Sequence, residues 1–124
     1  MKDFHKLKVW ERAHHMTLKV YLITQDFPKE ELYGLISQMR RSSASVPTNI
    51  AEGCGRDSKA ETIHFFNVAI GSASELEYQL LLAHDLHYME DKSYLELSGE
   101  LVEIRRMLYG LVQKLKTDKK PLPA

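Results

Sequence analysis

The chain has 124 residues, with 17 Lys and Arg against 17 Asp and Glu, so its formal net charge is zero. This length supports one domain with a single core, and a neutral chain gives no compositional reason to expect a polyanionic partner. The single cysteine, Cys54, cannot form an internal disulfide, which fits a reducing compartment. The N-terminal residues lack the apolar stretch of a secretory signal, and no apolar run is long enough to span a bilayer. We therefore expect one domain over residues 1–124, cytoplasmic and without a membrane partner, with a frayed tail from about residue 117.

Four segments carry apolar or small residues at alternating spacings of three and four, the pattern of a helix with one buried face. No segment alternates with a period of two, so we expect no sheet. The four stripes are Val9, Ala13, Met16, Val20 and Ile23; Leu32, Ile36, Met39, Ser43, Val46 and Ile50; Phe66, Ala69, Ala73, Leu76, Leu80 and Ala83; and Tyr94, Leu97, Leu101, Ile104, Leu108, Leu111 and Leu115.

Helix boundaries are expected where proline, glycine and serine interrupt these stripes. Proline disfavours helical geometry in the residue before it, glycine accepts a left-handed C-terminal cap, and Ser-x-x-Glu is the capping-box pattern. The first helix should end at Phe27-Pro28, the second at Gly53 and Gly55, and the third and fourth should begin after Ser58 and Ser93. Because the connections are short, we predict an all-α, antiparallel up-down-up-down four-helix bundle.

The second helix carries small residues and a proline at the middle of the predicted bundle. Residues 42–45 should lie level with residues 71–74 of the third helix, and small side chains on both would let the two backbones approach closely. Pro47 removes one hydrogen bond of the helix and should bend it in its last turns.

The strings "SVPTNIAEGCGR" (residues 45–56) and "AIGSASELEYQL" (residues 69–80) resemble a known family. It comprises the small four-helix-bundle proteins encoded in intervening sequences of bacterial large-subunit ribosomal RNA genes. The accessory bundle protein of diversity-generating retroelements is similar. The resemblance extends from "KLKVW" in the first helix to the fourth helix, and carries over Arg40, Asn49, Ala51, Glu52, Gly53, Arg56, Gly71, Ser72 and Glu75. It implies a homo-oligomeric ring with a pentamer as first choice, binding of structured RNA or DNA, no enzymatic activity and no cofactor.

Charge is distributed unevenly along the predicted bundle axis. One end collects ten cations against six carboxylates, whereas the other end has six carboxylates against two lysines. A basic end of this kind suits nucleic-acid phosphates, although lysines near helix C-termini also interact favourably with the helix dipole. The cations at the basic end are Lys2, Lys6, Lys8, Arg12, Arg56, Lys59, Lys114, Lys116, Lys119 and Lys120.

Two arginine sites refine the nucleic-acid hypothesis. At the start of the third helix, Arg56 and Lys59 flank free amides that suit a phosphate, although Ser58 and Glu61 can occupy those amides instead. On the second helix, we favour an ion pair with Glu75 for Arg40. The role of Arg41 stays open between an ion pair and a ligand contact facing a pore. Together with Lys6, Lys8 and Arg12, these arginines and Lys59 form the predicted nucleic-acid site.

The sequence gives little support to an enzymatic function. Glu11 with His14 and Glu61 with His64 have the spacing of di-iron carboxylate bundles, but the fourth helix offers glutamine and lysines at that level, so a metal-binding bundle is a remote alternative. Cys54 has no base beside it in the sequence and suits a small residue in a glycine turn. We therefore expect no enzyme and no metal site.

The first helix carries a second apolar line, Leu7, Trp10, Leu18 and Tyr21, beyond its core stripe. A second apolar line on a surface helix usually packs against another subunit, so these residues form the predicted oligomer interface. The same line also suits an adaptor that binds a different protein. Salt dependence separates the alternatives, because phosphate binding weakens steeply with salt and an apolar contact does not.

Overall fold

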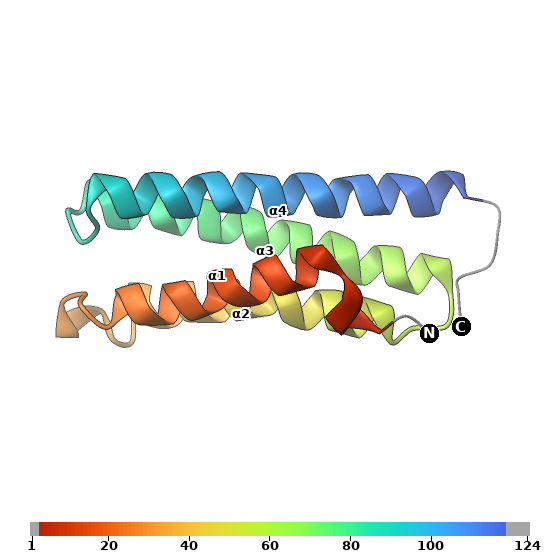
Figure 1. Cartoon of the computed structure of the whole chain (residues 1–124). Coiled ribbons are helices and arrows are strands. Elements are labelled where there is room, and N and C mark those ends of the chain that lie inside the picture. Colours follow the sequence, from red (N-terminus) through yellow and green to blue (C-terminus); the bar gives the residue numbers. More distant parts are fainter. Residues whose placement is uncertain (1–2, 119–124) are drawn as a thin grey trace.

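The computed structural model describes residues 3–118 of the chain. Its four long helices are α1 (Lys8–Thr24), α2 (Leu35–Cys54), α3 (Lys59–Asp85) and α4 (Asp91–Thr117), and two short 3-10 helices, η1 (Phe4–Lys6) and η2 (Lys29–Glu31), precede α1 and α2. Figure 1 shows the four long helices lying lengthwise beside one another. No strand occurs in the described part of the chain, so the all-α prediction is confirmed.

Each helix packs against two others, because α1 contacts α2 and α4, and α3 contacts α2 and α4. Hydrogen bonds show the relative directions of neighbours. Thr24 at the end of α1 meets Arg40 early in α2, whereas Thr17 meets Ser43. Likewise, Ser45 of α2 is hydrogen-bonded to Ser72 of α3. Gly53, which comes later in α2, accepts a hydrogen bond from Thr62, which comes earlier in α3. Contacts that run in opposite order along two helices are those of antiparallel neighbours.

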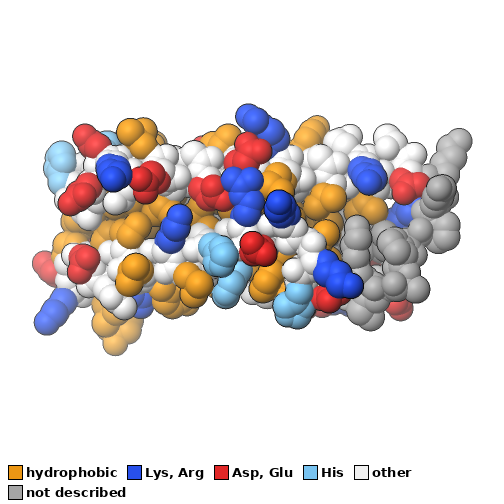
Figure 2. Space-filling model, in the orientation of Figure 1, with side chains coloured by type: hydrophobic (Ala, Val, Ile, Leu, Met, Phe, Trp, Pro, Cys, Tyr) orange, Lys and Arg blue, Asp and Glu red, His pale blue; other side chains and the backbone are white. Residues whose placement is uncertain are grey.

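The bundle has two distinct ends. At the terminal end, α1 and α3 begin and α2 and α4 finish; at the loop end lie the α1–α2 and α3–α4 connections (Figure 1). In Figure 2, red carboxylate side chains gather at the loop end, on the left of the view. The loop end therefore carries the acidic character that the sequence predicts for it.

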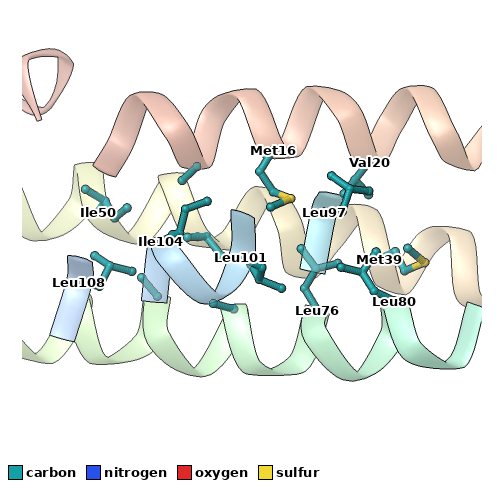
Figure 3. Packing of buried hydrophobic residues seen from close by; sticks show 14 of the residues in the cluster. Met16, Val20, Met39, Ile50, Leu76, Leu80, Leu97, Leu101, Ile104 and Leu108 are labelled. Atoms are coloured by element: carbon teal, nitrogen blue, oxygen red, sulfur yellow. The ribbon is translucent and has the colours of Figure 1, made fainter. Parts of the chain in front are cut away.

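The core is a single cluster contributed by all four long helices (Figure 3). All six residues of the predicted α3 stripe are buried, from Phe66 to Ala83. At helix ends the prediction was wrong: Leu32 precedes α2 and is exposed, while Leu35 is buried. In the last turns of α4, Val112 is buried and Leu111 and Leu115 are half-buried, because 3.6 residues per turn rotate a long stripe away from a strict seven-residue repeat.

Pro47 lies inside α2 without interrupting it, because the helix continues to Cys54. Proline has no backbone N–H, so the carbonyl of Ser43, four residues earlier, lacks its usual helical donor. The hydroxyl of Thr17 on α1 lies 2.9 Å from this carbonyl and 3.0 Å from the carbonyl of Ala13 in its own helix, so its one proton is shared between the two acceptors. A side chain of the neighbouring helix thus replaces the missing hydrogen bond. The bend expected at Pro47 stays a prediction.

The two glycines predicted to end α2 have other roles. Gly53 is buried within the helix, and a Cβ built there would lie 2.9 Å from the ring of Phe66 and 3.2 Å from the carbonyl oxygen of Thr62. Gly55 does follow the helix, but its φ of −84° is right-handed, so the left-handed cap was predicted wrongly. Gly53 is required by the close approach of α2 and α3 rather than by a helix end.

The other helix boundaries give a mixed outcome. Ser58 caps α3 as predicted, since its Oγ accepts from the backbone N–H of Glu61 at 3.1 Å. In contrast, α4 begins at Asp91 after Glu90, so the capping box at Ser93 was wrong; the backbone N–H of Tyr94 already bonds to the Glu90 carbonyl. The first helix ends at Thr24, before Phe27.

Candidate nucleic-acid interface and assembly surfaces

Among residues 3–118, the terminal end is electrically balanced. Of the ten cations that the sequence assigns to this end, Lys2, Lys119 and Lys120 lie outside the described residues, and Arg12 pairs with Glu100 of α4. Six cations and six carboxylates remain, so the basic character expected here is absent from the described part of the chain. The remaining charges are those of Lys6, Lys8, Arg56, Lys59, Lys114 and Lys116 against Asp3, Glu11, Glu52, Asp57, Glu61 and Asp118.

Arg56 is engaged within its own turn. Its guanidinium lies 2.7 Å from the Glu52 carboxylate and 3.7 Å from that of Glu61, and 4.7 Å above the ring of Phe65. Lys59 donates its Nζ proton to the carbonyl of Asp118. Ser58 already occupies the Glu61 amide, and the charged groups of Arg56 and Lys59 both have partners, so this turn offers less to a phosphate than the sequence predicts. Among the described residues, the buried Nε of Arg56 has no hydrogen-bond partner.

Arg12 connects α1 to α4 through one edge of its guanidinium, and its Nη1 donates to the Met107 sulfur at 3.4 Å. Its Nε and Nη2 donate to the two carboxylate oxygens of Glu100 at 2.7 and 2.9 Å. Bidentate pairs of this kind are strong and directional. The hydrogen bond from Arg12 holds the pKa of the Glu100 carboxyl below its usual value, against the opposing effect of burial. Arg12 therefore has a structural role, which is to hold α1 against α4.

The ion pair with Glu75 that the sequence assigns to Arg40 is formed by Arg41, so the prediction for Arg40 was wrong. Arg41, which the sequence left open, forms the ion pair with Glu75 of α3 and also donates to Gln38 at 2.9 Å. Arg40 instead donates to the Thr24 hydroxyl at 2.9 Å and to the Tyr21 carbonyl at 3.2 Å, with its guanidinium 4.8 Å from the Tyr21 ring centre. It thus binds one carbonyl and one hydroxyl in the last turn of α1, where the helix dipole favours a cation.

Every arginine in the described chain has an intramolecular partner, since Arg105 pairs with Glu77 and Arg106 with Glu103 in addition to the four above. Several lysines, in contrast, have no such intramolecular partner among the described residues. At the terminal end, no described residue forms an ion pair or side-chain hydrogen bond with the side chains of Lys6, Lys8, Lys114 and Lys116. Of the predicted nucleic-acid site, only Lys6 and Lys8 have side chains without such a partner.

The predicted oligomer interface separates into a covered and an exposed part. Leu7 and Trp10 are half-buried against the core, and the Phe4 ring of η1 packs 4.9 Å from the Trp10 ring. Leu18 and Tyr21 are exposed by 54% and 43%, and Leu22, which the sequence analysis did not select, is exposed by 65%. Leu18, Tyr21 and Leu22 share one helical face and are called the α1 stripe below. In Figure 2, apolar side chains gather at the lower left, over this half of the molecule.

A groove of about 590 Å³ lies at the other half of the α1–α2 pair. We call it the terminal groove. Aromatic side chains of η1 and α1 form one wall, and mostly small residues of α2 form the opposite wall. Its lining residues are Phe4, Trp10, His14 and Thr17 together with Ala44, Pro47, Thr48, Ala51, Glu52 and Gly55. The recurrence of small residues three or four apart from Ala44 to Gly55, opposite Trp10 and His14, is the signal by which the sequence could have revealed it.

The structure gives no positive support to the metal-binding alternative. Within residues 3–118, no three His, Cys, Asp or Glu side chains lie close enough together to share a metal ion. Cys54 is buried at the end of α2. None of the helices in that same range has the length and apolar character needed to cross a membrane.

Comparisons with known proteins agree with the sequence resemblance. The family described as 23S rRNA-intervening sequence protein matches residues 5–110. Among solved structures, a protein of unknown function from the S23 ribosomal protein family of Bacteroides thetaiotaomicron is similar, with a TM-score of 0.77 and 23% identity over 85% of this chain and 98% of that one. No curated protein matches. The match over most of its length places this chain in the 23S rRNA-intervening sequence protein family.

Proposed function

We propose that the protein is a non-catalytic homo-oligomer that assembles through the α1 stripe and binds structured nucleic acid with lysines of its terminal end. The observation that carries the proposal is the stripe itself, because Leu18, Tyr21 and Leu22 lie on one face and are each more than 40% exposed. Grouped apolar side chains of this kind mark interaction surfaces more often than isolated ones do. Burying one leucine fully contributes roughly 1.5–3 kcal/mol, so a stripe of this size supports association.

Light scattering at micromolar concentration tests the assembly. The wild-type chain should have the mass of an oligomer, with a five-membered ring as first choice from the family resemblance. Leu18→Glu with Leu22→Glu should reduce that mass, because two charges would have to be buried without partners. Leu95→Glu is the matched control: Leu95 is 66% exposed on α4, away from the stripe, and the change should leave the mass unaltered.

A wild-type monomer would overturn the assembly. The stripe would then fit the alternative of an adaptor that binds a different protein.

Nucleic-acid binding is supported by the lysines and by the family resemblance. Lys6, Lys8, Lys114 and Lys116 have side chains without ion-pair partners among the described residues, so they can contact phosphates without breaking an internal bond. Arginine does not offer this, because each arginine would first have to leave its intramolecular partner. Contacts made by lysine to phosphate position a nucleic acid without reading its sequence.

Binding of a hairpin RNA and of a duplex DNA, measured by fluorescence anisotropy at about 50 and about 200 mM salt, tests this second part. Affinity should fall steeply with salt, and the change of all four lysines to alanine should weaken binding to every sequence and flatten the salt dependence. Lys29→Ala with Lys92→Ala at the loop end is the control and should have little effect. Absence of binding even at low salt would reject nucleic acid as the ligand.

A further inference from the structure

We propose that His84 acts as a pH-sensitive switch at the junction of α3 and α4. With its ring protonated, His84 holds the first turn of α4, residues 91–93, against α3. With its ring neutral, this turn opens locally while the rest of the bundle stays folded. The switch uses neither the α1 stripe nor the lysines of the terminal end, so it is independent of the proposed function.

Two carboxylates face the two ring nitrogens of His84. Nε2 lies 2.6 Å from the Asp91 carboxylate, and Nδ1 lies 3.4 Å from that of Asp85. Only the protonated ring carries hydrogen on both nitrogens, so only this form can act as a donor toward both carboxylates. A neutral ring that keeps its Nε2 proton turns a lone pair toward Asp85. In that form the buried Nδ1, which has no hydrogen-bond partner among the described residues, faces a carboxylate without a proton between them.

The two carboxylates come from the two helices that meet at this junction. Asp85 is the last residue of α3 and Asp91 is the first residue of α4. Within residues 3–118, these are the charged groups that act on the ring, and neither α1 nor α2 contributes one. The Tyr94 ring of α4 stacks on the imidazole at 4.4 Å. The hydrogen bond with Asp91, assisted by Asp85 and opposed by desolvation, raises the pKa of His84 above 6.5, so its charge changes near neutral pH.

The first turn of α4 has no side-chain cap to hold it when His84 is neutral. Its N-cap residue, Glu90, forms no side-chain capping hydrogen bond, whereas Ser58 caps the corresponding turn of α3. The first N–H groups of a helix have no acceptor within that helix, so an uncapped first turn frays readily. Tyr94, which follows the turn, packs against the core. Opening is therefore confined to residues 91–93.

The connection between the two helices is strained at His87. Its φ of 63° lies in the left-handed region that favours glycine, and no other non-glycine residue of the described chain has a positive φ. The N–H of His87 donates to the His84 carbonyl and that of Tyr88 donates to the Ala83 carbonyl, both at 2.9 Å. The Tyr88 hydroxyl donates to the Glu31 carboxylate at 3.0 Å and anchors the connection to the other loop. His84 thus joins a strained turn, through its backbone, to an uncapped helix end, through its ring.

NMR spectroscopy of the full chain between about pH 5.5 and about pH 8 tests the switch, because this range brackets the ordinary histidine pKa of about 6.5. The amide signals of residues 91–93 should shift with the same midpoint as the His84 ring. Their backbone order parameters should fall from the rigid value of about 0.85 to below about 0.6 as the pH rises. Asp85→Asn should lower the midpoint, because it removes one of the two carboxylates that favour the protonated ring.

Two further variants make the test specific to His84. His84→Phe keeps a ring to stack on Tyr94 and removes both nitrogens, so residues 91–93 should be mobile at both ends of the pH range. His87→Gly removes the neighbouring histidine and suits the positive φ, so the midpoint for His84 should not change.

Three results would overturn the switch. Amide shifts of residues 91–93 that persist in His84→Phe would assign the titration to another group. Order parameters that stay near about 0.85 at about pH 8 would show that the turn does not open. Order parameters that fall along all four helices would show a general loosening of the bundle. None of these results depends on the mass of the protein in solution or on nucleic-acid binding, so the proposed function is tested separately.

Discussion

The terminal and loop halves of the bundle differ in how far their apolar side chains are covered by the chain itself. In the terminal half, Arg12 and Arg56 are paired with carboxylates and the apolar side chains of Leu7 and Trp10 are covered by the chain itself. In the loop half, Leu18 and Leu22 are more than half exposed. The terminal half therefore contains the terminal groove, and the loop half contains the exposed α1 stripe.

This difference separates residues that hold the fold from residues free to bind. Three of the five terminal-half cations predicted for the nucleic-acid site, namely Arg12, Arg56 and Lys59, have partners within the chain. In the α1 stripe, Arg40 contacts the ring of Tyr21, whereas Leu18 and Leu22 are more than half exposed. Intramolecular pairing thus favours the proposed assembly through α1 over phosphate binding by the arginines.

The largest effect should come from the terminal half, at the bond that compensates for Pro47. Thr17→Val keeps the shape of the side chain but leaves the Ser43 carbonyl without its donor. Loss of a partner by a buried polar group costs about 1–3 kcal/mol, so the free energy of unfolding in urea should fall by that amount.

Pro47→Ala supplies the matched control, because alanine restores a backbone N–H that can reach the Ser43 carbonyl. In this background Thr17→Val should cost much less, and the double-mutant cycle should show the difference as a coupling energy. An equal cost in both backgrounds would show that the Thr17 hydroxyl does not compensate for Pro47.

A smaller effect is expected in the loop half, where Arg40 binds the Tyr21 carbonyl and the Thr24 hydroxyl in the last turn of α1. Arg40→Met keeps much of the aliphatic length and removes the bonds to Thr24 and Tyr21. The expected loss is about 1–2 kcal/mol of unfolding free energy, measured by urea denaturation. Arg41→Met is the comparison: its ion pair with Glu75 is exposed, and such pairs contribute about 1 kcal/mol or less. If Arg41→Met proves the more damaging change, the assigned roles are wrong.

The smallest effect concerns His84, at the junction of α3 and α4. Its Nε2 lies 2.6 Å from the Asp91 carboxylate and its Nδ1 lies 3.4 Å from that of Asp85. The hydrogen bond with Asp91, assisted by Asp85 and opposed by desolvation, raises the pKa of His84 above 6.5. A raised folded-state pKa gives stability that is fully present below the unfolded pKa and is lost as pH rises through the folded value.

Urea unfolding of wild type and His84→Gln at about pH 5.5 and about pH 8 checks this sign against the ordinary histidine pKa of about 6.5. The wild type should be more stable than the variant at the lower pH, and the difference should shrink at the higher pH. A difference that grows with pH would contradict the raised pKa.

Residue spacing predicted the core well where a stripe lies far from helix ends. All predicted core positions of α3 are buried because its stripe faces both α2 and α4 along its length. At the end of α4, where the stripe rotates, the predicted positions Leu111 and Leu115 pack against the core but are only half-buried. Spacing also could not distinguish Arg40 from Arg41, since adjacent helix positions diverge by about 100° and a small rotation changes the partner.

The candidate site was less predictable than the fold. Charges could be assigned to ends from the sequence, but whether a cation is free depends on carboxylates that approach from other helices, as Glu100 approaches Arg12. The groove escaped notice because its small residues also suit tight helix packing. Only the path of η1 beside α1 shows that Ala44 and Ala51 border a hollow rather than a buried contact.

The mass of the protein in solution gives the most direct test of the account, because assembly through the α1 stripe is its central claim. Light scattering should be measured on one dilution series each of the wild type, of the Leu18→Glu/Leu22→Glu variant and of the Leu95→Glu control. The account predicts an oligomer for the wild type and the control and a smaller mass for the stripe variant at every concentration, because its two added charges would have to be buried without partners. Equal masses for the wild type and the stripe variant would contradict assembly through the α1 stripe.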